Sequence, residues 1–369
     1  MKTNVTLESL NLSDNDILDS GAELIGDFLK TNTGLKILYL SSCLIEHEGE
    51  RHLGEALRVN SVLTSLDLWS NPFGSSRTIA NALLSNTTLI DLNMEDTECG
   101  DLGAIAFASA LTMNTTLKSL SPQSNDIRFR GARALAVALK RNVGLTHMDL
   151  IDNDGFSDVG LRLLCASLEV KRNLAALHVG NVGTRHSAGG RAIANLLKRN
   201  KALTTLAVHL EFGYGRSPSC VPFIITDALS TNTVLTTLNL GGQNTSAAAA
   251  VRIAQALKME GNALKYLHLK HACIGDEGAS AIGHALESNT TLVLLGIGGN
   301  KIGVQGALTI GECLACNSSL ITLNLSENSI GMQGVCAIAE ALKLNRTLQH
   351  LEMHHCVLST DGIAVVADA

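Results

Sequence analysis

Few residues in this chain of 369 stand in a pattern that supports catalysis. The chain contains no Gly-x-x-x-x-Gly-Lys-Ser/Thr phosphate loop, no Gly-x-Ser-x-Gly nucleophile turn and no His-Glu-x-x-His zinc motif. Such motifs place a nucleophile, a base or a phosphate-binding backbone at fixed spacing, and the sequence offers no candidate for these roles. We therefore predict a protein that is not an enzyme, with no catalytic residues and no cofactor.

Cys313 and Cys316 have the Cys-x-x-Cys spacing of half a zinc site. No second cysteine pair follows at a suitable distance, and Cys313 falls on the expected inward face of a helix. We interpret Cys313 as a buried structural cysteine and predict no metal site. The nine cysteines form no paired framework and no signal peptide is evident at Met1, so we expect a cytoplasmic protein.

Charge and composition argue against two classes of partner. The chain has 28 basic and 34 acidic residues, for a net charge of −6, which gives no reason to expect binding to nucleic acid or to an anionic membrane. No stretch approaches 18 uninterrupted apolar residues, as a membrane span would require. Hydrophobic residues make up 46% but aromatic residues only 3%, which favours a core of many small, similar packing units.

A single repeat runs through the whole chain. The pattern Leu-x-x-Leu-x-Leu-x-x-Asn/Cys occurs thirteen times, in units of about 28 residues that start at residues 7, 35, 63, 89, 117, 145, 174, 203, 235, 264, 292, 320 and 348. The alternating leucines predict a short strand, and the apolar residues that follow at helical spacing predict a helix. We therefore predict one domain, residues 1–369.

Three polar columns accompany the leucines. Asp19, Ser75, Asp101, Asp276 and Thr360 come just before the expected helices and are candidate N-caps. An asparagine recurs near the helix end, as at Asn60 and Asn317, and we interpret it as a residue that ends the helix in the left-handed conformation. The ninth place of the unit is most often asparagine, and we expect its amide to bond to turn backbone inside the coil at Asn15, Asn71, Asn125, Asn153, Asn300 and Asn328.

One unit cannot bury its own apolar face, but stacked units share a continuous core. The predicted fold is an α/β leucine-rich-repeat solenoid, a horseshoe with a parallel sheet on the concave face and helices on the convex face. The 28-residue unit resembles the ribonuclease-inhibitor class of leucine-rich repeats, which also occurs in NOD-like receptors and in the Ran GTPase-activating protein. The resemblance covers the chain from Leu7 to about Ala369. The family commonly carries terminal caps, yet this chain enters its first repeat at Leu7 and stops inside the last helix, so we expect either exposed apolar ends or a longer protein.

The residues two, four and six places after each opening leucine face away from the core and form the surface of the sheet. In the first half of the chain this surface combines two aromatic residues with acidic ones, and in the second half it carries histidines. An exposed tryptophan among carboxylates is typical of an interface that attracts a basic partner. We predict partner-binding residues at Tyr39, Asp67, Trp69, Asp91, Glu95, Asp96, Asp149, His178, His209 and His268, with Asp152 beside them. The alternative is that Trp69 packs on its neighbours and the acids are merely solvated.

Two further features bear on binding. Eight of the twelve histidines lie on or beside these columns, and chance, a pH-sensitive interface and metal binding are open explanations. The eighth unit has 32 residues, and the insertion is expected to project as a loop that offers Phe212, Tyr214 and Arg216 to a partner. A surface insertion without function is the alternative.

We therefore predict a non-enzymatic scaffold or interaction module that holds a protein partner on its concave face, as the resemblance implies. One alternative is a GTPase activator similar to the Ran-activating family, with a small GTPase as partner, although the acidic tail common in that family is missing. Another is the sensor portion of a NOD-like receptor, or a ciliary or cytoskeletal scaffold. Fold alone does not separate these functions.

Overall fold

The computed structural model describes residues 4–180, 187–209, 221–242, 245–356 and 360–368. The predicted Phe212, Tyr214 and Arg216 lie outside these residues. The chain falls into two compact units, Met1–Gly183 and Thr184–Ala369, which we call unit 1 and unit 2 and describe separately. Among the described residues, no helix is long and apolar enough to cross a bilayer.

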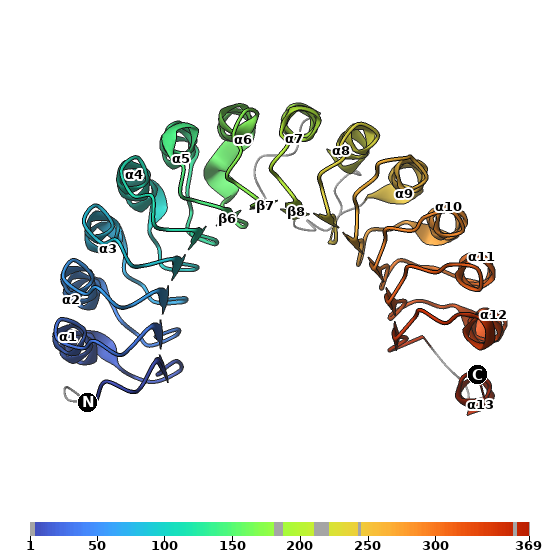
Figure 1. Cartoon of the computed structure of the whole chain (residues 1–369), viewed down its shortest axis with the longest axis horizontal. Coiled ribbons are helices and arrows are strands. Elements are labelled where there is room, and N and C mark those ends of the chain that lie inside the picture. Colours follow the sequence, from blue (N-terminus) through green and yellow to red (C-terminus); the bar gives the residue numbers. More distant parts are fainter. Residues whose placement is uncertain (1–3, 181–186, 210–220, 243–244, 357–359, 369) are drawn as a thin grey trace. The chain divides into compact units, whose positions relative to one another are not determined.

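Strands and helices alternate through unit 1, with one of each in a repeat (Figure 1). Its strands are β1 (Ser9–Asn11), β2 (Ile37–Tyr39), β3 (Ser65–Asp67), β4 (Asp91–Asn93), β5 (Ser119–Ser121), β6 (His147–Leu150) and β7 (Ala176–Gly180). Its helices are α1 (Leu18–Leu29), α2 (His47–Leu57), α3 (Arg77–Ala82), α4 (Gly100–Leu111), α5 (Phe129–Arg141) and α6 (Ser157–Leu168), with the short 3-10 helix η1 (Asp154–Phe156) before α6.

Unit 2 continues the same alternation. Its strands are β8 (Thr205–His209), β9 (Thr237–Asn239), β10 (Tyr266–His268), β11 (Leu294–Gly296), β12 (Thr322–Asn324) and β13 (His350–Glu352). Its helices are α7 (Ser187–Arg199), α8 (Val221–Leu229), α9 (Ser246–Leu257), α10 (Gly275–Leu286), α11 (Val304–Leu314), α12 (Gly331–Leu344) and α13 (Thr360–Ala367). All thirteen predicted strands are therefore found among the described residues, and the leucine-rich-repeat solenoid is confirmed.

Within each unit, every strand pairs in parallel with the next strand along the chain, and the repeat leucines stand in register. Leu38 pairs with Leu66, and Leu66 with Leu92, in unit 1; Leu267 pairs with Leu295 in unit 2. These leucines are almost completely buried, because they point from the sheet toward the helices. In each unit the strands lie on one side of the core and the helices on the other (Figure 1).

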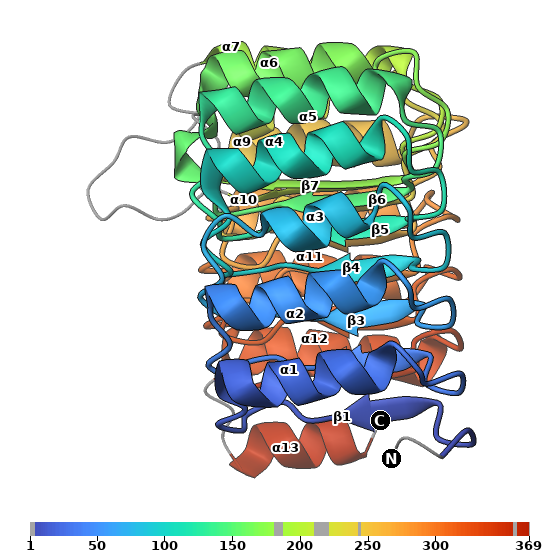
Figure 2. The ribbon, with the colours of Figure 1, turned by 90° about the vertical axis from the view of Figure 1, so that its left-hand side faces the viewer.

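Adjacent helices pack closely, as the row of helices α1 to α6 in Figure 2 shows. A Cβ atom on Gly54 of α2 would lie 2.7 Å from the backbone carbon of Thr78 on α3. A Cβ atom on Gly311 of α11 would lie equally close to the backbone carbon of Ala337 on α12, at 2.7 Å. Glycine at these two places lets one helix touch the backbone of the next.

The helix-end asparagines have a different role from the one predicted. Asn142 has φ −59° and ψ 134°, and Asn345 has φ −68° and ψ 136°, so neither adopts the left-handed conformation. The side chain of Asn345 accepts hydrogen bonds from the backbone amides of Thr347 and Leu348, and it donates to the carbonyl oxygen of Leu314 in the preceding repeat. The interpretation as a left-handed helix stop was wrong, because the side chain ties two repeats together instead.

The predicted role of the ninth-place asparagines is confirmed inside the stack. Asn300 is fully buried, and its side-chain oxygen accepts bonds from the backbone amides of Ala272 and Ile274 in the preceding repeat. Its nitrogen donates to the carbonyl oxygens of Leu269, Ile297 and Gly298. Asn71, Asn125 and Asn153 are buried and bonded to turn backbone in the same way.

Three of the predicted N-caps, Asp19, Asp101 and Asp276, act on the helix of the next repeat rather than on their own. Helix α3, which follows Ser75, has no capping hydrogen bond from its N-cap side chain, and the side chain of Thr360 lies outside the described residues. Asp19 lies inside α1, and its Oδ1 accepts the backbone amides of Glu46 and Gly49 at the start of α2, at 2.8 and 2.9 Å. Asp101 bonds in the same way to the start of α5, and Asp276 to the start of α11. The prediction had the right chemistry and the wrong helix, because the aspartate of one repeat lies beside the helix start of the next.

Candidate partner-binding site on the strand face of unit 1

The predicted aromatic and acidic residues of the first half of the chain lie on neighbouring strands of unit 1. Tyr39 of β2 is the register partner of Asp67 of β3, and Asp67 is the partner of Asn93 of β4. Trp69 follows β3, and its side chain is 42% exposed. Asp91, at the start of β4, is exposed on the same face. The structure thus brings Tyr39, Asp67, Trp69 and Asp91 onto one surface, which we call the acidic strand face together with Glu95 and Asp96.

Hydrogen bonds between residues two places apart, just after the strands, set the direction of these side chains. The Oδ1 atom of Asp67 accepts the backbone amide of Trp69 at 3.0 Å, and that of Asn93 accepts the amide of Glu95 at 3.0 Å. An aspartate or asparagine two residues before an amide closes such a turn readily. Asp67 therefore has a structural task, while its second carboxylate oxygen remains on the strand face.

The residues after these turns link one repeat to the next. Ser70 and Asp96 have positive φ values of 55° and 52°, and their amides donate to the carbonyl oxygens of Glu95 and Gln123 at 2.9 and 3.0 Å. The turn that carries Trp69 is thereby held directly beside the turn that carries Glu95. An aromatic side chain and a carboxylate are placed side by side by backbone geometry alone.

Negative charge accumulates around Glu95. Partial burial raises the pKa of Glu95, and repulsion from Asp149, Asp96, Asp152 and Asp67 raises it further. Among the ion pairs between described residues, none involves Asp67, Asp91, Glu95 or Asp96. On the acidic strand face Glu95 is therefore repelled by Asp67 and Asp96, and no basic side chain among the described residues forms an ion pair with these carboxylates.

Asp149 is already engaged within the protein. Its Oδ1 accepts the backbone amide of Ile151 at 3.0 Å, and its Oδ2 lies 2.9 Å from Nδ1 of His178 on the neighbouring strand β7. The side chains of His178 and Asp149 are 36% and 21% exposed. This pair marks one end of the acidic strand face, because both carboxylate oxygens of Asp149 already have partners.

The remaining predicted histidines belong to unit 2. His209 ends β8, and His268 ends β10, where burial lowers the pKa of its imidazole. Lys270 and His271 lie 2.9 and 3.5 Å from carboxylate oxygens of Glu327. Unit 2 therefore carries paired charges on its strand side, and its strand-side histidines belong to no metal-binding group among the described residues.

One set of side chains that the sequence reasoning missed has the composition of a metal site. His284, Glu287 and Cys313 bring a nitrogen, an oxygen and a sulfur atom within 4.8 Å of one another in the helix layer of unit 2. Cys313 is 1% exposed, which confirms that its thiol is buried. The missed signal was the His284-x-x-Glu287 pair, which lies one repeat before Cys313-x-x-Cys316.

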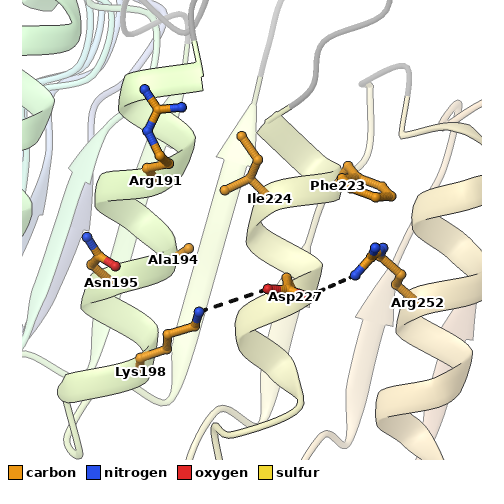
Figure 3. Close-up of a pocket in the computed structure, with 8 residues that line it drawn as sticks. All are labelled: Arg191, Ala194, Asn195, Lys198, Phe223, Ile224, Asp227 and Arg252. Atoms are coloured by element: carbon orange, nitrogen blue, oxygen red, sulfur yellow. Dashed lines mark hydrogen bonds and ion pairs between the residues drawn. The ribbon is translucent and has the colours of Figure 1, made fainter.

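Hollows between the described helices include two in the helix layers. One, of about 350 Å³, lies over α7, α8 and α9, where the Arg252 guanidinium is 4.0 Å from the centre of the Phe223 ring (Figure 3). Asp227 forms ion pairs with Arg252 at 2.8 Å and with Lys198 at 4.0 Å, so these charges neutralise one another within the protein. The other, of about 380 Å³, lies between α4 and α5. Neither hollow gathers groups for catalysis.

Comparison with known proteins supports the architecture. The sequence signature of the "Leucine Rich repeat" family matches residues 3–26, 262–283 and 316–339. A chain of the yeast Rad7 and Elc1 complex shares 15% identity over 95% of this chain and 85% of its own, with a TM-score of 0.58. A chain of the TLR13–ssRNA13 complex shares 17% identity over 95% of this chain and 44% of its own, with a TM-score of 0.49. No curated protein matches.

The likeness to the chain of the Rad7 and Elc1 complex shows the fold and leaves the function open. The leucine-rich-repeat solenoid is typically a scaffold for protein interactions rather than an enzyme, because stacked repeats expose an extended binding surface. The repeat pattern, the parallel strands in register and the matches to the family signature agree. The chain therefore has a leucine-rich-repeat fold, with a repeat unit consistent with the ribonuclease-inhibitor type.

Proposed function

We propose that this protein is an interaction module whose acidic strand face binds a positively charged segment of a partner protein. The observation that carries the proposal is the group of carboxylates at Asp67, Asp91, Glu95 and Asp96, which have no ion-pair partner within the described part of the chain and lie next to the exposed Trp69. A lysine or arginine of the partner relieves the repulsion around Glu95, while the indole supplies contact area and a face for a cation.

The geometry favours an extended basic segment over a nucleic acid. Neighbouring strands of a parallel sheet lie about 4.8 Å apart, so Tyr39, Trp69 and Glu95 form successive steps along the face. The same negative charge repels phosphates, and a nucleic-acid partner is therefore disfavoured. That a chain of similar fold is part of the yeast Rad7 and Elc1 complex supports a protein partner in general terms.

A titration with synthetic peptides tests the proposal. Trp69 is the only tryptophan of the chain, so its fluorescence reports directly on the acidic strand face. We expect a lysine- and arginine-rich peptide to change this fluorescence saturably, and more weakly as salt is added. A glutamate-rich peptide of the same length should have no effect. Equal binding of the two peptides, or binding of neither, contradicts the proposal.

Variants locate the binding surface by calorimetry. We expect Trp69→Ala to weaken binding of the basic peptide by about 2 kcal/mol, roughly thirtyfold in Kd, which is the usual cost of removing a central aromatic anchor. Glu95→Gln should weaken peptide binding as well, and Glu23→Gln is the matched control for that loss of charge, because Glu23 is exposed on helix α1. Unchanged affinity in Trp69→Ala, together with an unchanged melting temperature, places the binding elsewhere.

A further inference from the structure

The His284, Glu287 and Cys313 cluster lies in the helix layer of unit 2 and is independent of the proposed strand-face function. His284 is in the last turn of α10, Glu287 follows as the C-cap residue, and Cys313 is near the end of the next helix, α11. The Cys313 thiol donates to Oε1 of Glu287 at 3.3 Å and lies 3.7 Å from Nδ1 of His284. Nδ1 of His284 lies 3.6 Å from Oε1 of Glu287.

These three separations match the edges of a tetrahedral metal site. Zinc bonds of about 2.3 Å to sulfur, 2.0–2.1 Å to nitrogen and 2.0–2.2 Å to oxygen place ligand atoms roughly 3.4–3.6 Å apart at tetrahedral angles. The three ligand atoms therefore stand close to the positions that they would occupy around one ion. A mixed set of thiolate, imidazole and carboxylate suits a borderline transition metal better than calcium or magnesium.

The cluster also departs from the repeat in ways that packing does not require. Four residues before the helix-end asparagine, where Cys313 stands, seven other repeats have alanine, while Phe28 and Leu196 hold the place in two: the alanines are Ala56, Ala82, Ala110, Ala138, Ala228, Ala285 and Ala341. The place of Glu287 is often basic: Lys30, Arg58, Lys140, Lys198 and Lys343. A basic side chain suits the negative end of a helix and a carboxylate does not. Two departures that meet at one point indicate a ligand there.

Burial gives the cluster one protected and two accessible ligands. Residue Cys313 is 1% exposed, whereas the side chains of His284 and Glu287 are 56% and 54% exposed. An ion can therefore approach from solvent between the imidazole and the carboxylate and bond to the buried sulfur. Burial and the bond to Glu287 raise the pKa of the Cys313 thiol to about 12, so a bound metal must displace that proton into solvent.

We propose that Nδ1 of His284, Oε1 of Glu287 and Sγ of Cys313 bind one Zn²⁺ ion, with water in the fourth position. The sulfur binds as a thiolate after its proton leaves to solvent, and the carboxylate exchanges its hydrogen bond with the thiol for a bond to the metal. The ion joins the end of α10 to α11, and so links two consecutive repeats.

Metal titration of the purified, untagged chain tests this site. We expect one Zn²⁺ per chain after dialysis, and a thiolate-to-metal charge-transfer band when Co²⁺ replaces Zn²⁺. Cys313→Ala should abolish the band and weaken Zn²⁺ by more than about 100-fold, beyond the loss expected from an outer-shell partner alone. This variant should fold, because alanine occupies the place in other repeats. His284→Ala should also weaken Zn²⁺ binding.

Cys316→Ala is the matched control, because Cys316 is an exposed thiol three residues beyond Cys313. This variant should keep both the stoichiometry and the cobalt band. The proposal fails if the wild-type chain shows no cobalt–thiolate band, or if Cys313→Ala binds Zn²⁺ as tightly as the wild type. Circular dichroism of each variant shows that the helices are intact. None of these results depends on peptide binding to the acidic strand face of unit 1.

Discussion

The negative charge of Glu95 is expected to favour binding of the basic peptide and to lower the stability of the fold. Its partial burial and the four surrounding aspartates raise its pKa above the ordinary value of 4.5. A raised carboxyl pKa means that the folded state holds the proton more tightly than the unfolded state does. The stabilising effect of this protonation is complete below the ordinary pKa and is lost as pH rises through the folded-state pKa. At neutral pH, ionised Glu95 therefore destabilises the fold.

We expect Glu95→Gln to raise the melting temperature at pH 7 and to weaken binding of the basic peptide. The gain should vanish below the ordinary glutamate pKa, because both proteins are then uncharged at this position. The gain should be small, as for other partly exposed side chains. Melting curves from pH 4 to 8 measure it, with Glu23→Gln as the control. A gain that is the same at every pH would contradict the electrostatic explanation.

Asp276 shows how one element stabilises the start of the next. Its Oδ1 accepts the backbone amides of Gly303 and Gly306 at 2.7 and 2.9 Å, in the first turn of α11. An α-helix leaves its first amides without partners, and a carboxylate there also faces the positive end of the helix dipole. The capping residue is thus supplied by the preceding repeat, so stacking and helix formation are coupled.

We expect Asp276→Ala to lower the free energy of unfolding by about 1–2 kcal/mol, the usual cost of losing an N-cap. Hydrogen exchange should accelerate at the amides of Gly303 and Gly306 and remain slow in the middle of α11. Glu277→Ala removes the neighbouring exposed carboxylate and should change neither quantity. Equal exchange rates in Asp276→Ala and Glu277→Ala would show that the cap contributes nothing.

At the scale of the whole molecule, ladders of buried asparagines join successive repeats within each unit. The side chain of Asn300 bonds to backbone groups of its own repeat and of the preceding one. The backbone amide of Asn300 donates to the side-chain oxygen of Asn328, in the following repeat, at 2.9 Å. In a repeat protein the contacts between neighbours supply the cooperativity of unfolding. A defect in such a ladder should therefore affect more than one repeat.

We expect Asn300→Ala to destabilise the protein by several kcal/mol, because each buried backbone group that loses its partner costs about 1–3 kcal/mol. The denaturant transition should also broaden, since the coupling between repeats is weakened. Asn195→Ala, at an exposed position on α7, is the control and should stay close to wild type. A narrow transition with wild-type stability in Asn300→Ala would show that this ladder does not couple the repeats.

The sequence by itself determined the repeat, its strand and helix, and the columns that face outward, because the periods of alternating and helical residues are local properties. It also identified Tyr39, Asp67 and Trp69 as neighbours on one face. Only the tertiary structure decided which helix Asp276 caps, that Asp149 pairs with His178, and that His284 and Glu287 meet Cys313. Residues 26 to 30 places apart become neighbours only when consecutive repeats stack, and local patterns do not specify those contacts.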